Sequence, residues 1–374
     1  MVASFWAGRR VLLTGHTGFK GSWLSLWLLS LGAEVHGLAL APELEPNLFQ
    51  SLGLEHHQPH QLLPGIFFHN LLDIRDQQAL AKTVEEIQPD LVFHLAAQAL
   101  VRHSYLNPLE TWDVNVIGSL NLLEALKPLQ HPCAVVMVTT DKVYENQEWF
   151  HGYRETDPLG GHDPYSGSKA AMELAVASWR SSFCGDAPHQ TAHLAIATAR
   201  AGNVIGGGDW AADRIIPDAI RALALQQPIA VRNPCATRPW QHVLEPLSGY
   251  LLLAQRLYEQ QILGSQHANP LAQAYNFGPS IKSNRSVKEL LEALLSHWPG
   301  RWLDQSDPAQ PHEAGLLHLV SDLAEQQLGW SPRWDFAATV ERTVGWYREV
   351  HEGASPLECC LQDLEAYEAT KAIE

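Results

Sequence analysis

Residues 10–29 read RVLLTGHTGFKGSWLSLWLL, and this stretch decides the fold of the chain. A short apolar run leads through three evenly spaced glycines into a longer apolar helical run, 22–31. Glycine in such a turn permits a close approach of the backbone to a pyrophosphate, whose charge is favoured at a helix N-terminus. A merely structural turn would carry the same glycines. The order strand, turn and helix favours a dinucleotide site made of Gly15, Thr17, Gly18, Phe19, Lys20 and Gly21.

The first half of the chain repeats this alternation of short apolar runs and helical stretches, which is typical of a parallel sheet wrapped by helices. We expect helices after Gly21, Asp76, Pro108 and Pro164, since proline is tolerated in the first turn of a helix. The expected strands are Arg10–Thr14, Glu34–Leu38, Ile66–His69, Leu91–Leu95, Ala134–Thr139 and His193–Thr198. The sequence therefore predicts an α/β fold with a Rossmann-type, doubly wound parallel sheet.

Beyond Gly202 the pattern loosens into turns rich in glycine and proline, with shorter helices expected near 213–225 and 245–260. This change predicts a Rossmann domain over 1–202 and a smaller mixed α/β substrate-binding lobe over 203–374. The apolar run Ala274–Phe277 is expected to return to the first sheet as one more strand, within 273–278. Ligands of such a fold lie in the crevice at the carboxyl edge of the sheet.

Composition limits the partners that this protein can have. The 25 Lys and Arg residues stand against 41 Asp and Glu, a net charge of −16 that disfavours nucleic acid or an anionic membrane as partner. No apolar run has the length of a membrane span, and the first residues lack a signal-peptide pattern. The five cysteines form no C-x-x-C pattern and the histidines are dispersed. We expect free thiols, no metal site, no membrane contact and a cytoplasmic location.

The segments that would contact the adenosine end of a dinucleotide are less distinctive. The second strand ends in LALAP, residues 38–42, without the acid that binds the ribose of NAD or an arginine for the phosphate of NADP. No basic residue lies within 37–50, so NAD is the better prediction. Asp73 and Ile74 follow the third strand and could contact adenine, although Asp73 could equally cap the next helix.

Small residues follow the fourth expected strand in the segment Leu95-Ala96-Ala97-Gln98. They would let the chain pass beneath a bound dinucleotide, although packing alone would also explain them. Asn115 belongs to the next helix, where it would either bind backbone or water near a catalytic lysine or face solvent.

Tyr165 and Lys169 are the central catalytic candidates. Their spacing of four places both side chains on one face of a helix, where the ammonium can lower the pKa of the phenol toward the range of a general base. Such a pair is common on exposed helices. Its position after the strand that ends in Thr139-Thr140-Asp141-Lys142 favours a catalytic role.

The segments TGxxGxxG, HLAAQ and YxxxK occur here in the order found in extended short-chain dehydrogenases/reductases, the NAD-dependent epimerase/dehydratase group. The chain resembles this group over nearly its whole length. More narrowly, four segments resemble those of the CDP-glucose 4,6-dehydratase family. They are GHTGFKGSWL (15–24), TTDKVYEN (139–146), GHDPY (161–165) and RPWQH (238–242).

The resemblance implies a reaction in which Tyr165 takes the proton of the hexose 4-hydroxyl while hydride leaves carbon 4 for NAD. Thr140 would hydrogen-bond the 4-oxygen, and Lys169 would assist Tyr165. Asp141 and Lys142 lie where related dehydratases carry the acid and base that remove water across carbons 5 and 6. The division of work between these two stays open, because a lysine acts as a base only with a depressed pKa. A solvated Asp-Lys turn is the alternative.

The resemblance also implies the binding sites of the second lobe and the assembly. Gln98, Thr140, Asn203, Arg214, Arg238 and His242 would bind the nucleotide-sugar substrate. The basic side chains among them suit phosphate, although surface solubility also explains them. Trp240 would shape the nucleotide pocket or belong to the core. A homodimer packed through the helices after Pro108 and Pro164 is implied as well, with a role in deoxysugar biosynthesis such as that of lipopolysaccharide O-antigen.

Overall fold

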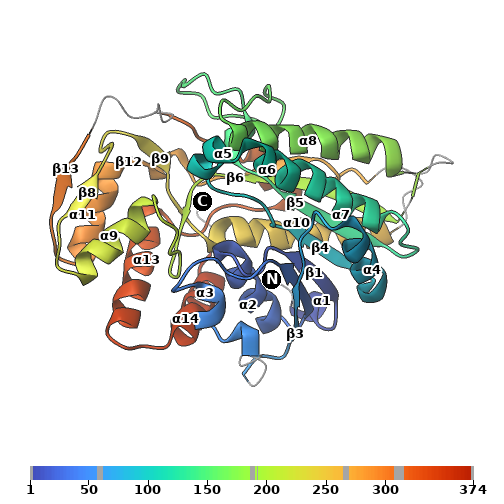
Figure 1. The fold of residues 1–374 in the computed structure, drawn as a ribbon, viewed down its shortest axis with the longest axis horizontal. Coiled ribbons are helices and arrows are strands. Elements are labelled where there is room, and N and C mark those ends of the chain that lie inside the picture. The colour runs from blue at the N-terminus through green and yellow to red at the C-terminus, as the bar shows by residue number, and fades with distance from the viewer. Residues whose placement is uncertain are drawn as a thin grey trace.

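A seven-stranded parallel sheet forms the centre of the molecule (Figure 1). The computed structural model describes residues 3–56, 62–185, 190–191, 193–263, 269–306 and 316–371. The strands are β1 (Arg10–Thr14), β2 (Glu34–Ala39), β3 (Ile66–Leu71), β4 (Leu91–His94), β5 (Cys133–Val138), β6 (Leu194–Ala201) and β11 (Ala274–Phe277). Their order is β11-β6-β5-β4-β1-β2-β3, which confirms the doubly wound sheet, because the chain winds outward from β1 in both directions.

The predicted strands are all present, and the returning strand β11 pairs with β6 in the same sheet. The largest difference in bounds is at β6, which continues to Ala201 instead of ending at Thr198. The continuation follows from pairing on both sides, since β5 and β11 both extend along this part of β6.

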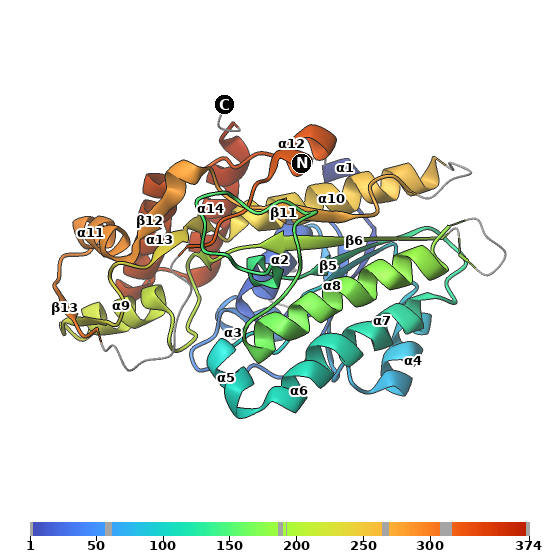
Figure 2. The same ribbon diagram turned by 90° about the horizontal axis from the view of Figure 1, so that it is seen from above.

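Helices cover both faces of the sheet (Figure 2). One face carries α4 (Gln77–Ile87), α5 (Val101–Leu106), α6 (Pro108–Trp112), η3 (Asp113–Gly118), α7 (Ser119–Leu126) and α8 (Pro164–Phe183). The other face carries α1 (Ala3–Trp6), α2 (Phe19–Ser30), α10 (Leu244–Ile262) and α12 (Asp322–Leu328). The single helix predicted after Pro108 is interrupted, because η3 is a π-helical turn between α6 and α7.

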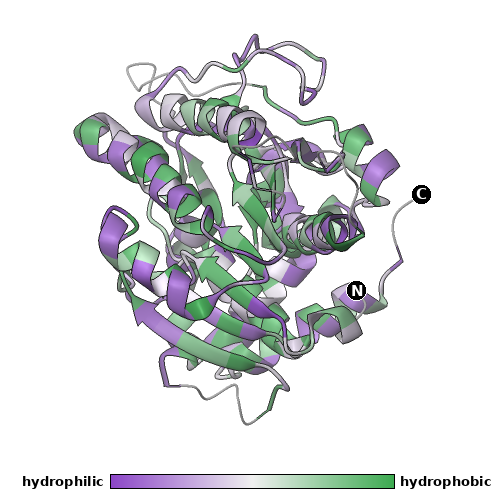
Figure 3. Cartoon of the chain, turned by 90° about the vertical axis from the view of Figure 1, so that its right-hand side faces the viewer, coloured by the Kyte–Doolittle hydropathy of each residue, from purple (hydrophilic) through white to green (hydrophobic). Residues whose placement is uncertain are grey.

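The core follows from this layering. Strand β1 sends Val11 and Leu13 to one hydrophobic cluster and Leu12 to the other, as the two-residue period of a strand requires. Strand β5 is buried throughout, since both of its faces are covered. Figure 3 shows that the strands are mainly hydrophobic, whereas hydrophobic and hydrophilic residues alternate along the outer helices. Within the described ranges, no helix is both long and apolar enough to cross a membrane.

The second half of the chain builds a lobe beside the carboxyl edge of the sheet (Figure 1). Three two-stranded pairs lie in it: β7 (Val204–Ile205) with β10 (Gln241–His242), β9 (Thr237–Pro239) with β12 (Asn284–Ser286), and β8 (Ile229–Val231) with β13 (Trp302–Asp304). Its helices are α9 (Ile215–Ala224), α11 (Val287–His297), α13 (Phe336–His351) and α14 (Pro356–Ala369). Short segments complete the fold: α3 (Leu48–Ser51), η1 (Leu54–His56), η4 (Asp141–Val143) and η5 (Ile281–Ser283).

Helix α10 differs in position from what the sequence pattern indicates. It lies in the half of the chain assigned to the lobe, yet it covers β5 and β6 of the central sheet (Figure 2). Its buried residues extend almost all round the helix, and that pattern is typical of a helix packed against a sheet and further helices. The sheet therefore receives both a strand and a covering helix from beyond Gly202.

Candidate active site

The glycine-rich turn lies at the carboxyl end of β1, as predicted. Gly15 has a φ of +76°, and a Cβ there would lie 2.7 Å from the Ala96 backbone nitrogen. Only glycine fits this position without strain. Helix α2 begins at Phe19 and not after Gly21, which corrects the expected start. Gly21 belongs to its first turn, where a side chain would overlap the carbonyl of Gly15.

This turn is suited to hold the pyrophosphate of a dinucleotide. Gly18 is the N-cap of α2 and forms no side-chain cap, so the N–H groups of the first turn keep their capacity to bind an anion. A Cβ at Gly18 would meet only the Gly15 carbonyl oxygen, at 3.4 Å, and the residue is exposed. The Thr17 hydroxyl donates to the Leu40 carbonyl at 2.9 Å and ties the turn to the end of β2.

The structure excludes one of the two roles considered for Asp73, that of a helix cap. Its carboxylate accepts from the Arg75 guanidinium at 2.6 Å, and this pairing holds the pKa of the Asp73 carboxyl below its usual value. Helix α4 is capped instead by Asp76, whose side chain accepts from the Ala79 backbone N–H. Ile74 is buried beside Gly118. Asp73 is thus no helix cap, and contact with adenine stays a prediction for both residues.

Asn115 is buried in the π-helical turn, which excludes the solvent-facing alternative. Its amide donates to the Gln98 carbonyl at 3.1 Å and to the Ser168 hydroxyl at 2.9 Å, and its oxygen accepts from the Gln98 N–H. It therefore joins the segment 95–98 to helix α8 at the residue before Lys169. The Gln98 side chain is held locally, because it donates to Thr111 at 2.9 Å.

Helix α8 presents Tyr165 and Lys169 on one face, as their spacing predicts. Asp163 caps the helix by accepting the Ser166 N–H at 3.0 Å, and Pro164 occupies the first turn. The Ser104 hydroxyl of α5 accepts the Tyr165 backbone N–H at 3.1 Å. These contacts fix where the helix begins and hence where the phenol lies.

The expected effect of Lys169 on the pKa of the Tyr165 phenol stays a prediction. Burial raises the pKa of the Tyr165 phenol to about 12, while a hydrogen bond with Thr140 acts in the opposite direction. The Lys169 ammonium donates instead to the Val138 carbonyl at 3.3 Å. Burial lowers the pKa of Lys169 to about 8, against the attraction of Glu173. The ammonium is therefore oriented by the end of β5.

Asp141 is a buried carboxylic acid at the end of β5, 3% exposed. Burial raises its pKa, and the charges of Lys142, Arg238 and Lys20 only partly oppose this. The Thr140 hydroxyl lies 3.0 Å from the carboxylate. Because burial raises its pKa, this carboxyl suits the predicted role of a proton donor beside the Thr140 hydroxyl, and that role stays a prediction. The alternative of a solvated Asp-Lys turn is excluded for Asp141.

Lys20 also faces this group of side chains, although it comes from the glycine-rich turn. Burial and the nearby Arg214 lower the pKa of its ammonium to about 8, whereas Asp141 raises it. Lys20 and Lys169 repel each other as well. Sequence reasoning places Lys20 among the cofactor contacts, and its electrostatic neighbours additionally place it beside the acid.

Two of the predicted substrate arginines lie in electrostatic range of the catalytic candidates. Arg214 pairs with Asp209 at 2.8 Å and attracts the ionised form of Tyr165. Arg238 of β9 acts on Asp141. Asn203 follows the end of β6 and is half-buried. The two arginines are thus brought to the carboxyl edge of the sheet, where an anionic substrate would need them.

His242 is a buried residue of the lobe, and its contact with substrate stays a prediction. Its side chain is fully buried in β10, with ring centroids 6.0 Å from Trp23 and 4.8 Å from Trp334. Burial lowers the pKa of this imidazole to about 3, so the ring is neutral. Trp240 is also a core residue, and its indole donates to the Arg285 carbonyl. Both aromatic rings are part of the core.

Sequence reasoning missed Glu173, a buried residue of α8 that contacts β6 and the end of β5. Its carboxylate accepts from the Thr198 hydroxyl and the Arg200 guanidinium, both at 2.8 Å, and from Thr139. Glu173 follows Lys169 by four residues, so the spacing that picks out Tyr165 and Lys169 also places Glu173 on the same helix face. That signal was present in the sequence.

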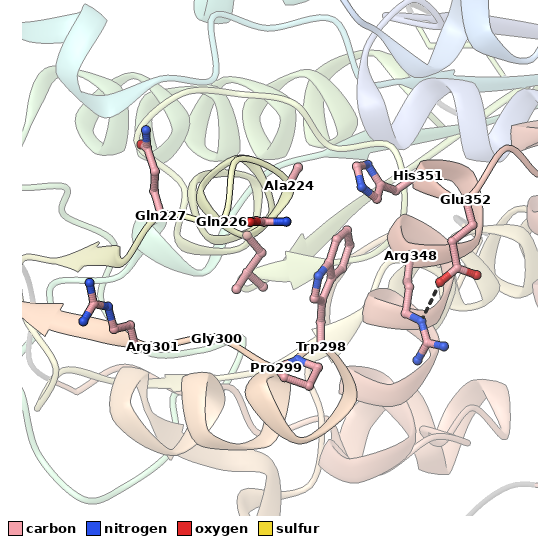
Figure 4. Close-up of a pocket in the computed structure, with 11 residues that line it drawn as sticks. Ala224, Gln226, Gln227, Trp298, Pro299, Gly300, Arg301, Arg348, His351 and Glu352 are labelled. Carbon is pink, nitrogen blue, oxygen red and sulfur yellow. Dashed lines mark hydrogen bonds and ion pairs between the residues drawn. The ribbon is translucent and has the colours of Figure 1, made fainter.

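A separate surface cavity of about 640 Å³ lies in the lobe, between the end of α9 and the ends of α11 and α13 (Figure 4). It is lined by residues such as Gln226, Trp298, Arg301 and Arg348. The Arg348 guanidinium is paired with Glu352 at 3.0 Å. None of the catalytic candidates borders this cavity, so it is distinct from the site at the sheet edge.

The chain is similar to known proteins over most of its length. Residues 12–343 match the model of the family described as GDP-mannose 4,6 dehydratase. A CDP-glucose 4,6-dehydratase of Salmonella typhimurium is 43% identical over 366 residues, which cover 97% of each chain. A dTDP-glucose 4,6-dehydratase of Xanthomonas campestris is 25% identical over 360 residues, covering 90% of this chain and 92% of that one.

Solved structures share the fold. The dTDP-glucose 4,6-dehydratase DesIV of Streptomyces venezuelae, with NAD and TYD bound, aligns with a TM-score of 0.72 at 25% identity, covering 93% of this chain and 99% of that one. A UDP-glucose-4-epimerase of Stenotrophomonas maltophila aligns with a TM-score of 0.76 at 23% identity, covering 92% and 100%. Dehydratases and epimerases therefore share this architecture, and the site must decide between their reactions.

Proposed function

The chain belongs to the GDP-mannose 4,6-dehydratase family, and we propose that within it this enzyme is a hydro-lyase that converts CDP-glucose to CDP-4-dehydro-6-deoxy-glucose and water. The buried acid at Asp141 carries this proposal. An epimerase has no need of an acid beside the carbon 6 hydroxyl, whereas loss of water requires one. The similarity over the full length to a CDP-glucose enzyme supports the choice of base and sugar.

The residues at the sheet edge supply the proton transfers. Tyr165 accepts the proton of the 4-hydroxyl, with Thr140 hydrogen-bonded to it, and carbon 4 becomes a ketone. The ketone acidifies carbon 5, whose proton leaves to a base, for which Lys142 is the neighbouring candidate. Asp141 protonates the departing 6-hydroxyl, so that water leaves and a double bond forms between carbons 5 and 6. A hydride then adds at carbon 6 and a proton at carbon 5.

NAD is the cofactor that the turn at residues 15–21 would hold. When bound, NAD supplies the acceptor and later the donor of the hydride. The exposed backbone at Gly18 and the first turn of α2 suit its pyrophosphate. Asp73, Ile74 and the segment 95–97 are the further contacts proposed for its adenosine and nicotinamide parts. The end of β2 offers no cation for a 2′-phosphate, so stimulation by NADP should be the weaker.

The substrate is proposed to lie between the sheet edge and the lobe. Arg214 and Arg238 would pair with the diphosphate, while Gln98, Thr140 and Asn203 would contact the hexose. This division assigns cofactor binding mainly to residues 1–202 and substrate binding mainly to 203–374. The position of α10 on the sheet modifies the boundary but not the assignment of the two arginines.

A turnover assay tests the proposed substrate. The purified enzyme is incubated with CDP-glucose and NAD, and the 4-keto-6-deoxy product is followed by its ultraviolet band in alkali. We expect product from CDP-glucose and little from the UDP-, dTDP- and GDP-linked hexoses. Product from another of these sugars alone would contradict the substrate and leave the mechanism standing. An epimer without loss of water would contradict the dehydratase assignment.

A homodimer is the proposed assembly. Helices α5, α6 and α8 lie side by side on one face (Figure 2), and they expose large apolar side chains to an unusual degree. Leu106 is 80% exposed and Leu109 85%, and Trp112, Ile117 and Leu174 add to this surface. A contiguous apolar patch of this kind marks a protein interface in a soluble protein. A second copy, packed through the same helices, would bury it.

The remaining expectations concern location and pathway. We propose a cytoplasmic location, which the free thiols of all five cysteines support, since disulfides are rare in reducing compartments. A 4-keto-6-deoxy sugar nucleotide is an intermediate of deoxysugar biosynthesis. Its use in lipopolysaccharide O-antigen is the route that the family resemblance favours.

A further inference from the structure

A buried ion pair contacts both ends of the turn that carries Thr140, Asp141 and Lys142. It joins Arg200 of β6 to Glu173 of α8 at 2.8 Å, and the two side chains are 4% and 3% exposed. Burial removes the hydration of both charges, and an apolar pair of similar volume is often equally stable. The presence of this pair therefore calls for an explanation other than stability.

The first end of the turn is held by Glu173. Thr139, the residue before Thr140, donates its hydroxyl to Glu173 Oε1. The other carboxylate oxygen accepts from the Thr198 hydroxyl and the Arg200 guanidinium of β6, both at 2.8 Å. Each oxygen of the carboxylate thus has its own donor, so the carboxylate cannot rotate without breaking one of these hydrogen bonds.

The second end of the turn is held by Arg200. Its guanidinium donates to the Tyr144 hydroxyl at 2.8 Å, and that hydroxyl donates to Asn276 Oδ1 of β11 at 2.7 Å. The guanidinium also donates to the Glu155 carbonyl at 3.1 Å and lies 5.1 Å from the centroid of the Tyr144 ring. Because Thr139 and Tyr144 flank the turn, one ion pair fixes both of its ends.

The same ion pair connects the turn to the helix that carries the phenol. Glu173 lies one helical turn after Lys169 and two turns after Tyr165, on the same face of α8. Strand β6, which carries Arg200, is paired with β5, and the turn follows β5. The position of the turn relative to α8 is therefore set by contacts of the ion pair with both.

We propose that Glu173 and Arg200 are positioning residues, which hold the turn 139–144 against α8 so that Asp141 and Tyr165 reach the same hexose. This inference rests on the proposed function. Groups that transfer protons to and from one sugar must be placed accurately, since a misplacement of about 1 Å can cost roughly 100-fold in rate. Buried side chains that are locked by hydrogen bonds provide such accuracy.

Thr139→Val tests the first end, because it removes one hydroxyl and keeps the shape of the side chain. In a single turnover with CDP-glucose and NAD, we expect product to form about 10- to 100-fold more slowly. The steady-state KM for CDP-glucose should change by less than about twofold, because the arginines proposed for the diphosphate lie outside the turn. Thr139→Ser keeps the hydroxyl and should recover most of the rate.

Thr198→Val is the matched control. Thr198 is also buried and donates to the same carboxylate, but it is followed by the strand residue Ala199 and by no candidate of the site. Its rate should stay within about twofold of the wild type. The midpoint of thermal unfolding should fall by a similar amount in both valine variants, since each loses one hydrogen bond to Glu173. Equal losses of rate in the two variants would overturn the proposal, as would a rise in KM alone for Thr139→Val.

Tyr144→Phe tests the second end and keeps the proposal falsifiable if the first variant folds poorly. It removes the hydroxyl between Arg200 and Asn276 but keeps the ring. We expect a loss of rate of about 10-fold or more at an unchanged KM. Tyr275→Phe is the control on the neighbouring strand β11, because the Tyr275 hydroxyl donates to Gln327, and this variant should keep the wild-type rate. A wild-type rate for Tyr144→Phe would overturn the role of Arg200.

The outcome for the wild-type enzyme separates this inference from the proposed function. Wild-type enzyme that makes no product from CDP-glucose would contradict the proposed function itself. Normal wild-type turnover, with Thr139→Val and Tyr144→Phe unaffected, would contradict only the positioning role of the ion pair.

Discussion

At the scale of single residues, burial determines the chemistry of the site. The same removal from water that raises the pKa of Asp141 and Tyr165 lowers the pKa of Lys20 and Lys169. Desolvation disfavours every charged form, so burial raises the pKa of an acid and lowers the pKa of an amine. A site with these properties suits proton transfer in both directions.

Asp141→Asn should separate the two halves of the reaction. Oxidation at carbon 4 needs Tyr165 and Lys169, whereas loss of water needs the acid as well. Removal of a positioned acid costs roughly 100- to 10,000-fold in its step, so the 4-ketone and the reduced-nicotinamide absorbance should persist after mixing with substrate. Tyr165→Phe should suppress that absorbance from the start. Near wild-type product formation by Asp141→Asn would refute the role of this residue.

The residues that sequence reasoning identified share a local signal, and Glu173 was missed although its spacing of four from Lys169 is such a signal. Gly15, Tyr165 and Asp141 belong to short motifs with a fixed spacing. His242 belongs to a motif that also builds the core of the lobe, so its predicted contact with substrate is not decided by the motif alone.

At the scale of elements, helices α2, α8 and α10 converge on the carboxyl edge of the sheet from both faces. Helix α8 brings Tyr165 and Lys169, α2 brings Lys20 and the N–H groups of its first turn, and α10 covers β5 and β6. The long apolar patterns of strands and helices made the sheet predictable. The C-terminal helices α11 to α14 were not predicted, since they pack in a lobe whose short elements have weak periodicity.

The start of α10 is joined to the C-terminal segment by the buried carboxyl of Glu245. It accepts the backbone N–H of Trp334 at 2.7 Å and the hydroxyl of Tyr367 at 2.7 Å. Burial raises its pKa from 4.5 to about 7. Between these two pH values, the folded state therefore keeps a proton that the unfolded state has lost. The stability contributed by this group is fully present below pH 4.5 and is lost as the pH rises through 7.

Glu245→Gln should remove this pH dependence. As the pH rises from about 5 to 8, the unfolding free energy of the wild type should fall relative to that of the variant by on the order of 3 kcal/mol. Denaturant unfolding at a series of pH values measures it. Glu259→Gln is the control on the same helix, because Glu259 is more exposed and paired with Arg256. A difference that stays constant with pH would contradict the raised pKa.

At the scale of the whole molecule, an ion pair joins a helix of the sheet to the lobe. Arg102 of α5 pairs with Asp213 of the lobe at 3.2 Å, and Arg232 pairs with the same carboxylate at 2.9 Å. The fold class and the returning strand were predictable, because a parallel sheet imposes its pattern over many residues. How the lobe meets the sheet depends on such long-range pairs, which no local pattern reveals.

The proposed dimer should depend on the apolar surface of α5, α6 and α8. Leu109→Glu places a charge in that surface, so the variant should be monomeric at micromolar concentration, where the wild type is dimeric. Size-exclusion chromatography with light scattering measures the mass. Leu263→Glu is the control, because Leu263 is 78% exposed at the end of α10, outside this surface. A monomeric wild type, or a dimeric Leu109→Glu, would contradict the proposed interface.

The central claim is that this enzyme removes water by moving hydrogen within one sugar, and an isotope experiment tests it most directly. CDP-glucose carrying deuterium at carbon 4 is converted completely, and the product is examined by mass spectrometry and NMR. The account predicts a product lighter than the substrate by one water, with the deuterium retained at carbon 6. Deuterium that remains at carbon 4, as in an epimer or unchanged sugar of full mass, would contradict it, as would deuterium lost to solvent.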